Sequence, residues 1–89
     1  MKRIFFSDHA RDAMARRRLL EEDVLAVAKA PEQVIDIRMG RVLAQSIRAL
    51  GEDHQVYLLR VVIDVWPEGL EIVTTYKTTR ITKYWRGVQ

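Results

Sequence analysis

His9 is the residue of this sequence best suited to moving a proton near neutral pH. It follows Ser7 and Asp8, which are both good residues to begin a helix, so we expect it in a first helical turn. The positive end of the helix dipole disfavours the imidazolium, whereas the Asp8 carboxylate favours it. His9 is therefore either a general acid or base, or a histidine that only caps or packs. His54 follows a glycine and two acidic residues and is interpreted as solvated surface.

Arginine side chains suggest a second kind of chemistry, the binding of phosphate. Arg17 lies with Arg16 and Arg18 at the end of the first predicted helix, where cations are favourable without any function. A guanidinium there also suits phosphate, which it binds in a bidentate manner. Arg60 interrupts an apolar strand, and a charge at that place costs stability unless it is paired or partly exposed. It either pairs with a neighbouring strand or lies on an open face of the sheet, directed at a ligand anion.

The last part of the chain interleaves aromatic rings with basic side chains. This combination suits single-stranded nucleic acid, because rings stack on bases and cations hold the backbone. The alternative is that Tyr84 and Trp85 anchor the C-terminal tail onto the sheet. The residues concerned are Tyr76, Lys77, Arg80, Lys83, Tyr84, Trp85 and Arg86.

The charges are distributed unevenly, although the net charge is only +3. Residues 1–20 hold six basic and two acidic side chains, and residues 76–89 hold four basic and none acidic. Residues 21–36 between them hold five acidic and one basic. The two basic blocks either meet in space and form one positive surface, or they are ordinary scatter over a solvated surface.

Several function classes are excluded or made unattractive by composition. The chain has no cysteine, which excludes disulfides and a cysteine nucleophile. With two histidines, no carboxylate cluster at ligand spacing and four scattered glycines, neither a metal site nor a phosphate-cradling glycine loop is expected. We therefore expect no cofactor and no metal. No signal peptide and no run of about 20 apolar residues is visible, so we expect a cytoplasmic protein with no membrane partner.

The elements that must position these residues follow from the hydrophobic periodicity. Helical spacing and good capping residues predict two helices before Pro31, and period-two alternation predicts strands after it. The helices are expected over 8–17 and 21–29, and the strands over 34–38, 41–48, 56–66 and 70–79. The apolar run 4–6 is either an edge strand or an N-terminal staple, and 80–89 is a basic, aromatic tail.

This order of elements predicts one domain, residues 1–89, with an α+β fold. Two N-terminal helices would pack on one face of a three- to four-stranded antiparallel sheet. In the strand 56–66, the side chains that alternate from Tyr57 to Val65 are expected to point at the helices.

Two stretches together resemble a known family of small bacterial domains, domain-of-unknown-function family 4258. The first is Ser7-Asp8-His9-Ala10, continued by Met14, Arg17, Glu22-Asp23-Val24 and Pro31. The second runs from Val73 to Trp85 and reads VTTYKTTRITKYW. The similarity covers about residues 5–86.

That resemblance implies a relation to the metal-independent ribonucleases of the RelE and barnase type, and hence a RelE-like fold with a basic active face. Carried over to this sequence, it makes His9, Arg17 and Lys77 the catalytic residues, with Tyr76 nearby. It also suggests a toxin-type protein with an antitoxin partner. The chain departs from the family pattern at Ala13, where an arginine is usual, and at Arg18, where a glycine is usual.

Two functional hypotheses result. In the first, the domain cleaves RNA without metal: His9 acts as acid or base, and Arg17, Arg60 and Lys77 stabilise the phosphate. His9, Arg17 and Lys77 are then expected on one concave surface. The second is a non-catalytic module that binds nucleic acid or a protein through the same basic face. The nucleic-acid-binding residues are predicted to be Arg60, Tyr76, Arg80, Lys83 and Tyr84.

Overall fold

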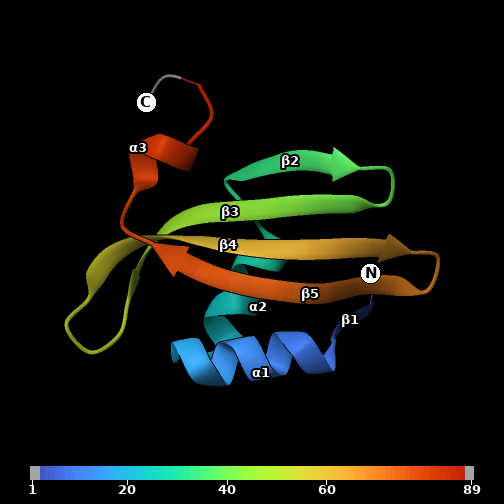
Figure 1. The fold of residues 1–89 in the computed structure, drawn as a ribbon, viewed down its shortest axis with the longest axis horizontal. Coiled ribbons are helices and arrows are strands. Elements are labelled where there is room, and N and C mark those ends of the chain that lie inside the picture. The colour runs from blue at the N-terminus through green and yellow to red at the C-terminus, as the bar shows by residue number, and fades with distance from the viewer. Residues whose placement is uncertain (1–2, 88–89) are drawn as a thin grey trace.

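The structure is a computed structural model that describes residues 3–87. Figure 1 shows a single sheet with two helices on one side and a short third helix near its end. The elements are β1 (Arg3–Phe6), α1 (Asp8–Arg17), α2 (Glu21–Lys29), β2 (Gln33–Arg38), β3 (Arg41–Leu50), β4 (Gln55–Trp66), β5 (Gly69–Thr78) and α3 (Ile81–Tyr84). Within the described residues, no helix is long and apolar enough to cross a membrane.

The sheet has five strands in the order β1-β5-β4-β3-β2. Neighbouring strands from β2 to β5 are antiparallel, but β1 pairs with β5 in parallel. The expected three- to four-stranded antiparallel, RelE-like sheet is therefore wrong, since the sheet is mixed and has one strand more. The apolar run at residues 4–6 forms the extra strand, and its side chains Ile4 and Phe6 pack against the core.

Local sequence signals explain where α1 and α2 begin and end. The Ser7 hydroxyl accepts a hydrogen bond from the Ala10 amide at 3.0 Å, which caps the first turn of α1. The helix α2 starts with three acidic residues, which suit the positive end of its dipole, and it ends before Pro31. Both helices have the bounds that the sequence predicts.

The core lies between these two helices and one face of the sheet. Val24 and Val27 of α2 pack in one cluster with Leu59 and Val61 of β4 and with Ile72 of β5. In Figure 1, α2 lies behind the sheet, and α1 runs alongside β5. Val65 is 39% exposed although it alternates with the core residues of β4, so the last residue predicted to face the helices lies outside the core.

The opposite face of the sheet carries the residues that alternate with this core, among them Gln45 and Arg60. It is covered at one end by α3, because the Tyr84 carbonyl accepts a hydrogen bond from the Gln45 side chain. The predicted C-terminal tail thus contains a short helix. Residues 88 and 89 of that tail lie outside the described residues. We call the sheet face with Gln45 and Arg60 the open face.

Arg18 ends α1 in a left-handed conformation, with φ of 55°. Its amide donates to the Ala15 carbonyl, and the Leu19 amide donates to the Met14 carbonyl at 2.9 Å. This pattern is a Schellman motif, whose left-handed position favours glycine. The geometry therefore favours glycine at this position and makes Arg18 a strained residue there.

Replacing Arg18 by glycine should stabilise the fold by about 1 kcal/mol, because glycine adopts the left-handed region without the steric cost of a Cβ atom. For a domain of this size that is a rise in Tm of about 4–8 °C. The matched control is Ala15→Gly in the same helix, which should lower stability by about 1 kcal/mol. Thermal melting of both variants checks the prediction, and an Arg18→Gly variant that melts below the wild type would contradict it.

Candidate nucleic-acid interface

Four polar residues form one row across the open face. Gln33, Gln45, Arg60 and Tyr76 are direct register partners on β2, β3, β4 and β5, so their side chains leave the sheet on the same side. The Nε2 atom of Gln45 donates to Gln33 Oε1 at 2.8 Å, and the Nε atom of Arg60 donates to Gln45 Oε1 at 2.9 Å. Arg60 Nη1 donates to the Tyr76 hydroxyl at 2.5 Å. We call these four residues the polar row.

Arg60 is only 8% exposed, so a cation is buried in the middle of the sheet. Of the two alternatives for Arg60, pairing with neighbouring strands is observed, on both sides of β4. The ring of Tyr84 from α3 covers the guanidinium, with its centroid 4.3 Å from Cζ, and the Tyr76 ring lies at 5.6 Å. Both distances suit cation–π interactions, which offset part of the cost of removing the guanidinium from water.

The C-terminal segment is held to the polar row by hydrogen bonds to its backbone. Gln45 Nε2 donates to the Tyr84 carbonyl at 3.2 Å, and Gln33 Nε2 donates to the Arg86 carbonyl at 2.7 Å. The Arg86 amide donates back to Gln33 Oε1 at 3.1 Å. Because backbone groups make these contacts, the basic side chains of the segment are not required to hold it in place.

The basic side chains of this segment lie at the surface. Arg80, Lys83 and Arg86 are exposed, whereas Tyr84 and Trp85 are half-buried. Within residues 3–87, the ion pairs closer than 4.0 Å involve other arginines, namely Arg11, Arg16, Arg41 and Arg48. We call residues 80–86 the basic segment.

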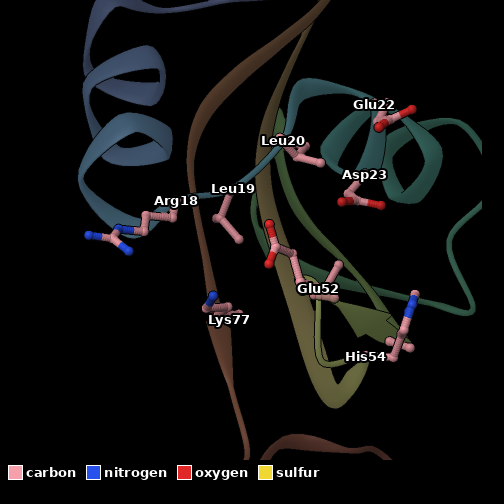
Figure 2. Close-up of a pocket in the computed structure, with 11 residues that line it drawn as sticks. Arg18, Leu19, Leu20, Glu22, Asp23, Glu52, His54 and Lys77 are labelled. Carbon is pink, nitrogen blue, oxygen red and sulfur yellow. The ribbon is translucent and has the colours of Figure 1, made fainter.

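Lys77 lies on the other side of the sheet from Tyr76, its neighbour in β5. It is the register partner of Leu59, a core residue, and its Nζ atom lies 4.8 Å from the centroid of the Tyr57 ring. Figure 2 shows Lys77 at the edge of a cleft between the end of α1, the start of α2 and the β3–β4 turn. The expected closeness of Lys77 and Tyr76 in one site is therefore not observed.

The cleft beside Lys77 carries charges of both signs. Its basic residues are Lys77 and Arg18, and its acidic residues are Glu22, Asp23 and Glu52. His54 also lines it, from the β3–β4 turn (Figure 2). Three carboxylates against two cations do not favour a phosphate, so this cleft is a poor place for a nucleic-acid backbone.

His9 and Arg17 lie at opposite ends of α1. The helix begins beside β5 at residues 72–73, where the Ser7 amide donates to the Ile72 carbonyl at 3.0 Å. It ends where Arg17 Nη1 donates to the Thr75 carbonyl, also at 3.0 Å. At 1.5 Å per residue, His9 and Arg17 are separated by about 12 Å along the axis. His9 is exposed, and neither it nor Arg17 lines the cleft that contains Lys77, so the structure does not bring the three residues together on one concave surface.

Ala13, where the resemblance leads us to expect an arginine, is a fully buried residue of α1. An arginine at this position of the present helix would point into the core between α1 and β5. The alanine therefore serves packing here and offers no contact to a ligand.

One ion pair joins β3 and β4 at the end of the sheet away from the basic segment. Arg41 Nε donates to Asp64 Oδ1 at 2.6 Å, and Arg41 Nη2 donates to Asp64 Oδ2 at 2.9 Å. This bidentate hydrogen bond lowers the pKa of Asp64 below its ordinary value and raises the pKa of Arg41.

Because the pKa of Asp64 is lowered by folding, the ion pair stabilises the protein above the ordinary aspartate pKa of about 3.9, and this stabilisation is lost as the pH falls through the lowered value. Asp64→Asn should therefore lower the Tm at neutral pH, and its difference from the wild type should shrink in acid. The control is Asp36→Asn, an exposed residue on β2. Melting curves from neutral to acidic pH test this, and a difference that stays constant with pH would contradict it.

Gln33 and Gln45 are the site residues that the sequence did not indicate. Gln45 is completely buried, and the nitrogen and oxygen of its side-chain amide connect β2, α3 and Arg60. A glutamine inside an otherwise apolar strand is the available signal, because a buried amide requires partners. Identifying these partners requires the register of four strands, which periodicity does not provide.

Comparison with known proteins gives one match. No curated protein and no solved structure resembles the chain significantly. Residues 6–77, which include α1, α2 and all of β2, β3 and β4, match the family described as Domain of unknown function (DUF4258). The chain therefore belongs to this family.

Proposed function

We propose that this domain binds single-stranded RNA through the basic segment, residues 80–86, where it lies over the open face of the sheet. The observation that carries the proposal is the exposure of Arg80, Lys83 and Arg86, none of which takes part in an ion pair within residues 3–87. Cations without carboxylate partners remain available to neutralise phosphates.

The aromatic residues of the segment supply the second component of such an interface. The Nζ atom of Lys83 lies 5.3 Å from the centroid of the Tyr84 ring, so cation and ring are adjacent. Single-stranded nucleic acids bind where bases stack on exposed rings and the backbone follows nearby cations. Tyr84 and Trp85 are half-buried, which fixes their rings while leaving part of each accessible.

Binding is favoured over metal-independent cleavage because the groups needed for catalysis do not converge. Cleavage requires a base for the 2′-hydroxyl, an acid for the leaving oxygen and cations at the phosphate. His9 lies at the start of α1, whereas the basic segment lies on the opposite face of the sheet. Cleavage with His9 as acid or base is therefore the second outcome that the experiment tests.

The test is a titration of a single-stranded RNA oligonucleotide at low and moderate salt, in the presence of a chelator. Affinity should fall as salt rises, with a logarithmic slope of about −2 if three phosphates are neutralised. Gel analysis of the same samples shows whether the RNA remains intact. Binding that is absent at low salt, or that is indifferent to salt, would contradict the proposal. Cleaved RNA would assign the domain a metal-independent ribonuclease activity instead.

A further inference from the structure

Arg60 has more hydrogen-bond donors than the protein uses. A guanidinium carries five N–H groups and no acceptor. Nε donates to Gln45 Oε1 and Nη1 donates to the Tyr76 hydroxyl. Within residues 3–87, Nη2 makes no hydrogen bond to protein, and no carboxylate lies within 4.0 Å of the guanidinium.

The unused nitrogen is nevertheless in contact with solvent. Among the described residues, no side-chain nitrogen or oxygen is sealed from solvent without a hydrogen-bond partner. Arg60 Nη2 therefore keeps some contact with solvent, although the residue is only 8% exposed. Removing a guanidinium from water without a carboxylate partner is costly, and an anion at Nη2 would reduce that cost.

The groups around this edge are donors rather than acceptors. Gln45 Oε1 is taken by Arg60, and Gln33 Oε1 is taken by both Gln45 and the Arg86 amide. The Tyr76 hydroxyl accepts from Arg60, and its own proton is left free to donate to a ligand. Free hydrogen-bond donors beside a positive charge favour the binding of an oxyanion. They disfavour a cation, and also a neutral group that has few hydrogen-bond acceptors.

We propose that Arg60 Nη2 and the Tyr76 hydroxyl form a binding site, which we call the seat, for a single phosphate monoester. In the bound RNA this monoester is the terminal phosphate. This inference rests on the proposed function, because it names the end of the strand as the feature recognised. An internal phosphodiester lies within a continuous backbone, which the exposed cations of the basic segment can follow. A group as deeply placed as Arg60 is reached by a terminal phosphate, which projects from the strand and carries a charge of about −1.5 to −2.

The experiment compares three RNA oligonucleotides of one sequence, with a 5′-phosphate, with a 3′-phosphate, and with hydroxyls at both ends. Inorganic phosphate alone is a fourth ligand, followed by thermal shift and by the NMR signal of the Arg60 Nε–H group. One of the phosphorylated ends should bind about tenfold more tightly than the hydroxyl-ended strand, since charge-assisted hydrogen bonds are gained. Inorganic phosphate should raise the Tm and shift the Arg60 signal.

Tyr76→Phe is the variant of choice, because it removes the hydroxyl and keeps the ring against Arg60. It should reduce the preference for a phosphorylated end, measured as the ratio of the affinities for the phosphorylated and the hydroxyl-ended strands. Tyr57→Phe is the matched control, since that hydroxyl donates to Gln55 at 3.2 Å and its ring lies on the helix side of the sheet. It should behave as the wild type does.

The outcomes separate this seat from the proposed function. Equal affinities for all three strands, with no response to inorganic phosphate, overturn the seat and leave RNA binding in place. Equal affinities with a response to inorganic phosphate overturn the terminal-RNA assignment and give the seat to a free oxyanion. A response to inorganic phosphate without binding of any strand supports the seat and contradicts the proposed function.

Discussion

A variant in which Arg80, Lys83 and Arg86 are all replaced by glutamine should bind single-stranded RNA about a hundredfold more weakly at low salt. The logarithmic salt slope should decrease in magnitude by about 2, because three phosphate contacts are lost and each contributes about 0.7 on a single strand. Fluorescence anisotropy at several salt concentrations measures both quantities. The fold should be retained, since these side chains are exposed and the segment is held through its backbone.

The control for this variant carries the same change of net charge elsewhere. Arg16, Lys29 and Arg38 are exposed cations on α1, on α2 and at the end of β2. Replacing them by glutamine also takes the net charge from +3 to zero. If the control loses as much affinity as the first variant, binding follows overall charge and the basic segment is not the interface.

The parts of the fold that depend on neighbours in sequence were predictable. The start of α1 follows from the Ser7 cap and its extent from the helical spacing that ends at Arg17, and α2 is stopped by Pro31. The four longer strands were placed within two residues at each end, because alternation of apolar residues marks a half-buried strand. These signals act over a few residues and need no knowledge of the tertiary structure.

The fifth strand was not predictable in the same way, because its partner is distant in sequence. The Ser7 hydroxyl donates to the Val73 carbonyl across 66 positions, and Phe6 pairs with Ile72. Three apolar residues before a helix cap are equally suited to a strand and to a hydrophobic staple. The choice between them depends on whether β5 has a free edge and on whether residues 4–6 lie beside that edge.

The candidate site was predictable in its residue types and not in its geometry. Arg60 and Tyr76 were selected as single residues, but their connection through Gln45 and Gln33 depends on the register of four strands. Side chains alternate between the two faces of the sheet along β5, so Tyr76 and Lys77 lie on opposite faces. The sequence motif alone suggests that these neighbouring residues belong to one site. The sheet therefore divides the predicted basic residues between two faces.

Gly69→Ala should destabilise the fold by about 3 kcal/mol, the largest effect on stability that we expect from one added methyl group. Gly69 is the partner of Arg3 where β1 joins β5. A Cβ atom at this position would clash with the Arg3 carbonyl oxygen, and a backbone atom has little freedom to move away. The Tm should fall by about 12 °C or more.

Gly40→Ala separates this steric effect from the loss of glycine's conformational freedom. Gly40 has φ of +83° with nothing within 4 Å of its added Cβ, so alanine there should cost only about 1 kcal/mol of backbone strain. Gly69 has no positive φ, and its cost is therefore purely one of space. Hydrogen exchange should show protection lost first at the amides of β1, because relief of the clash separates β1 from β5. A Gly69→Ala variant with the same Tm as the wild type would show that β1 does not pair tightly with β5. The mixed sheet would then be reduced to its four antiparallel strands.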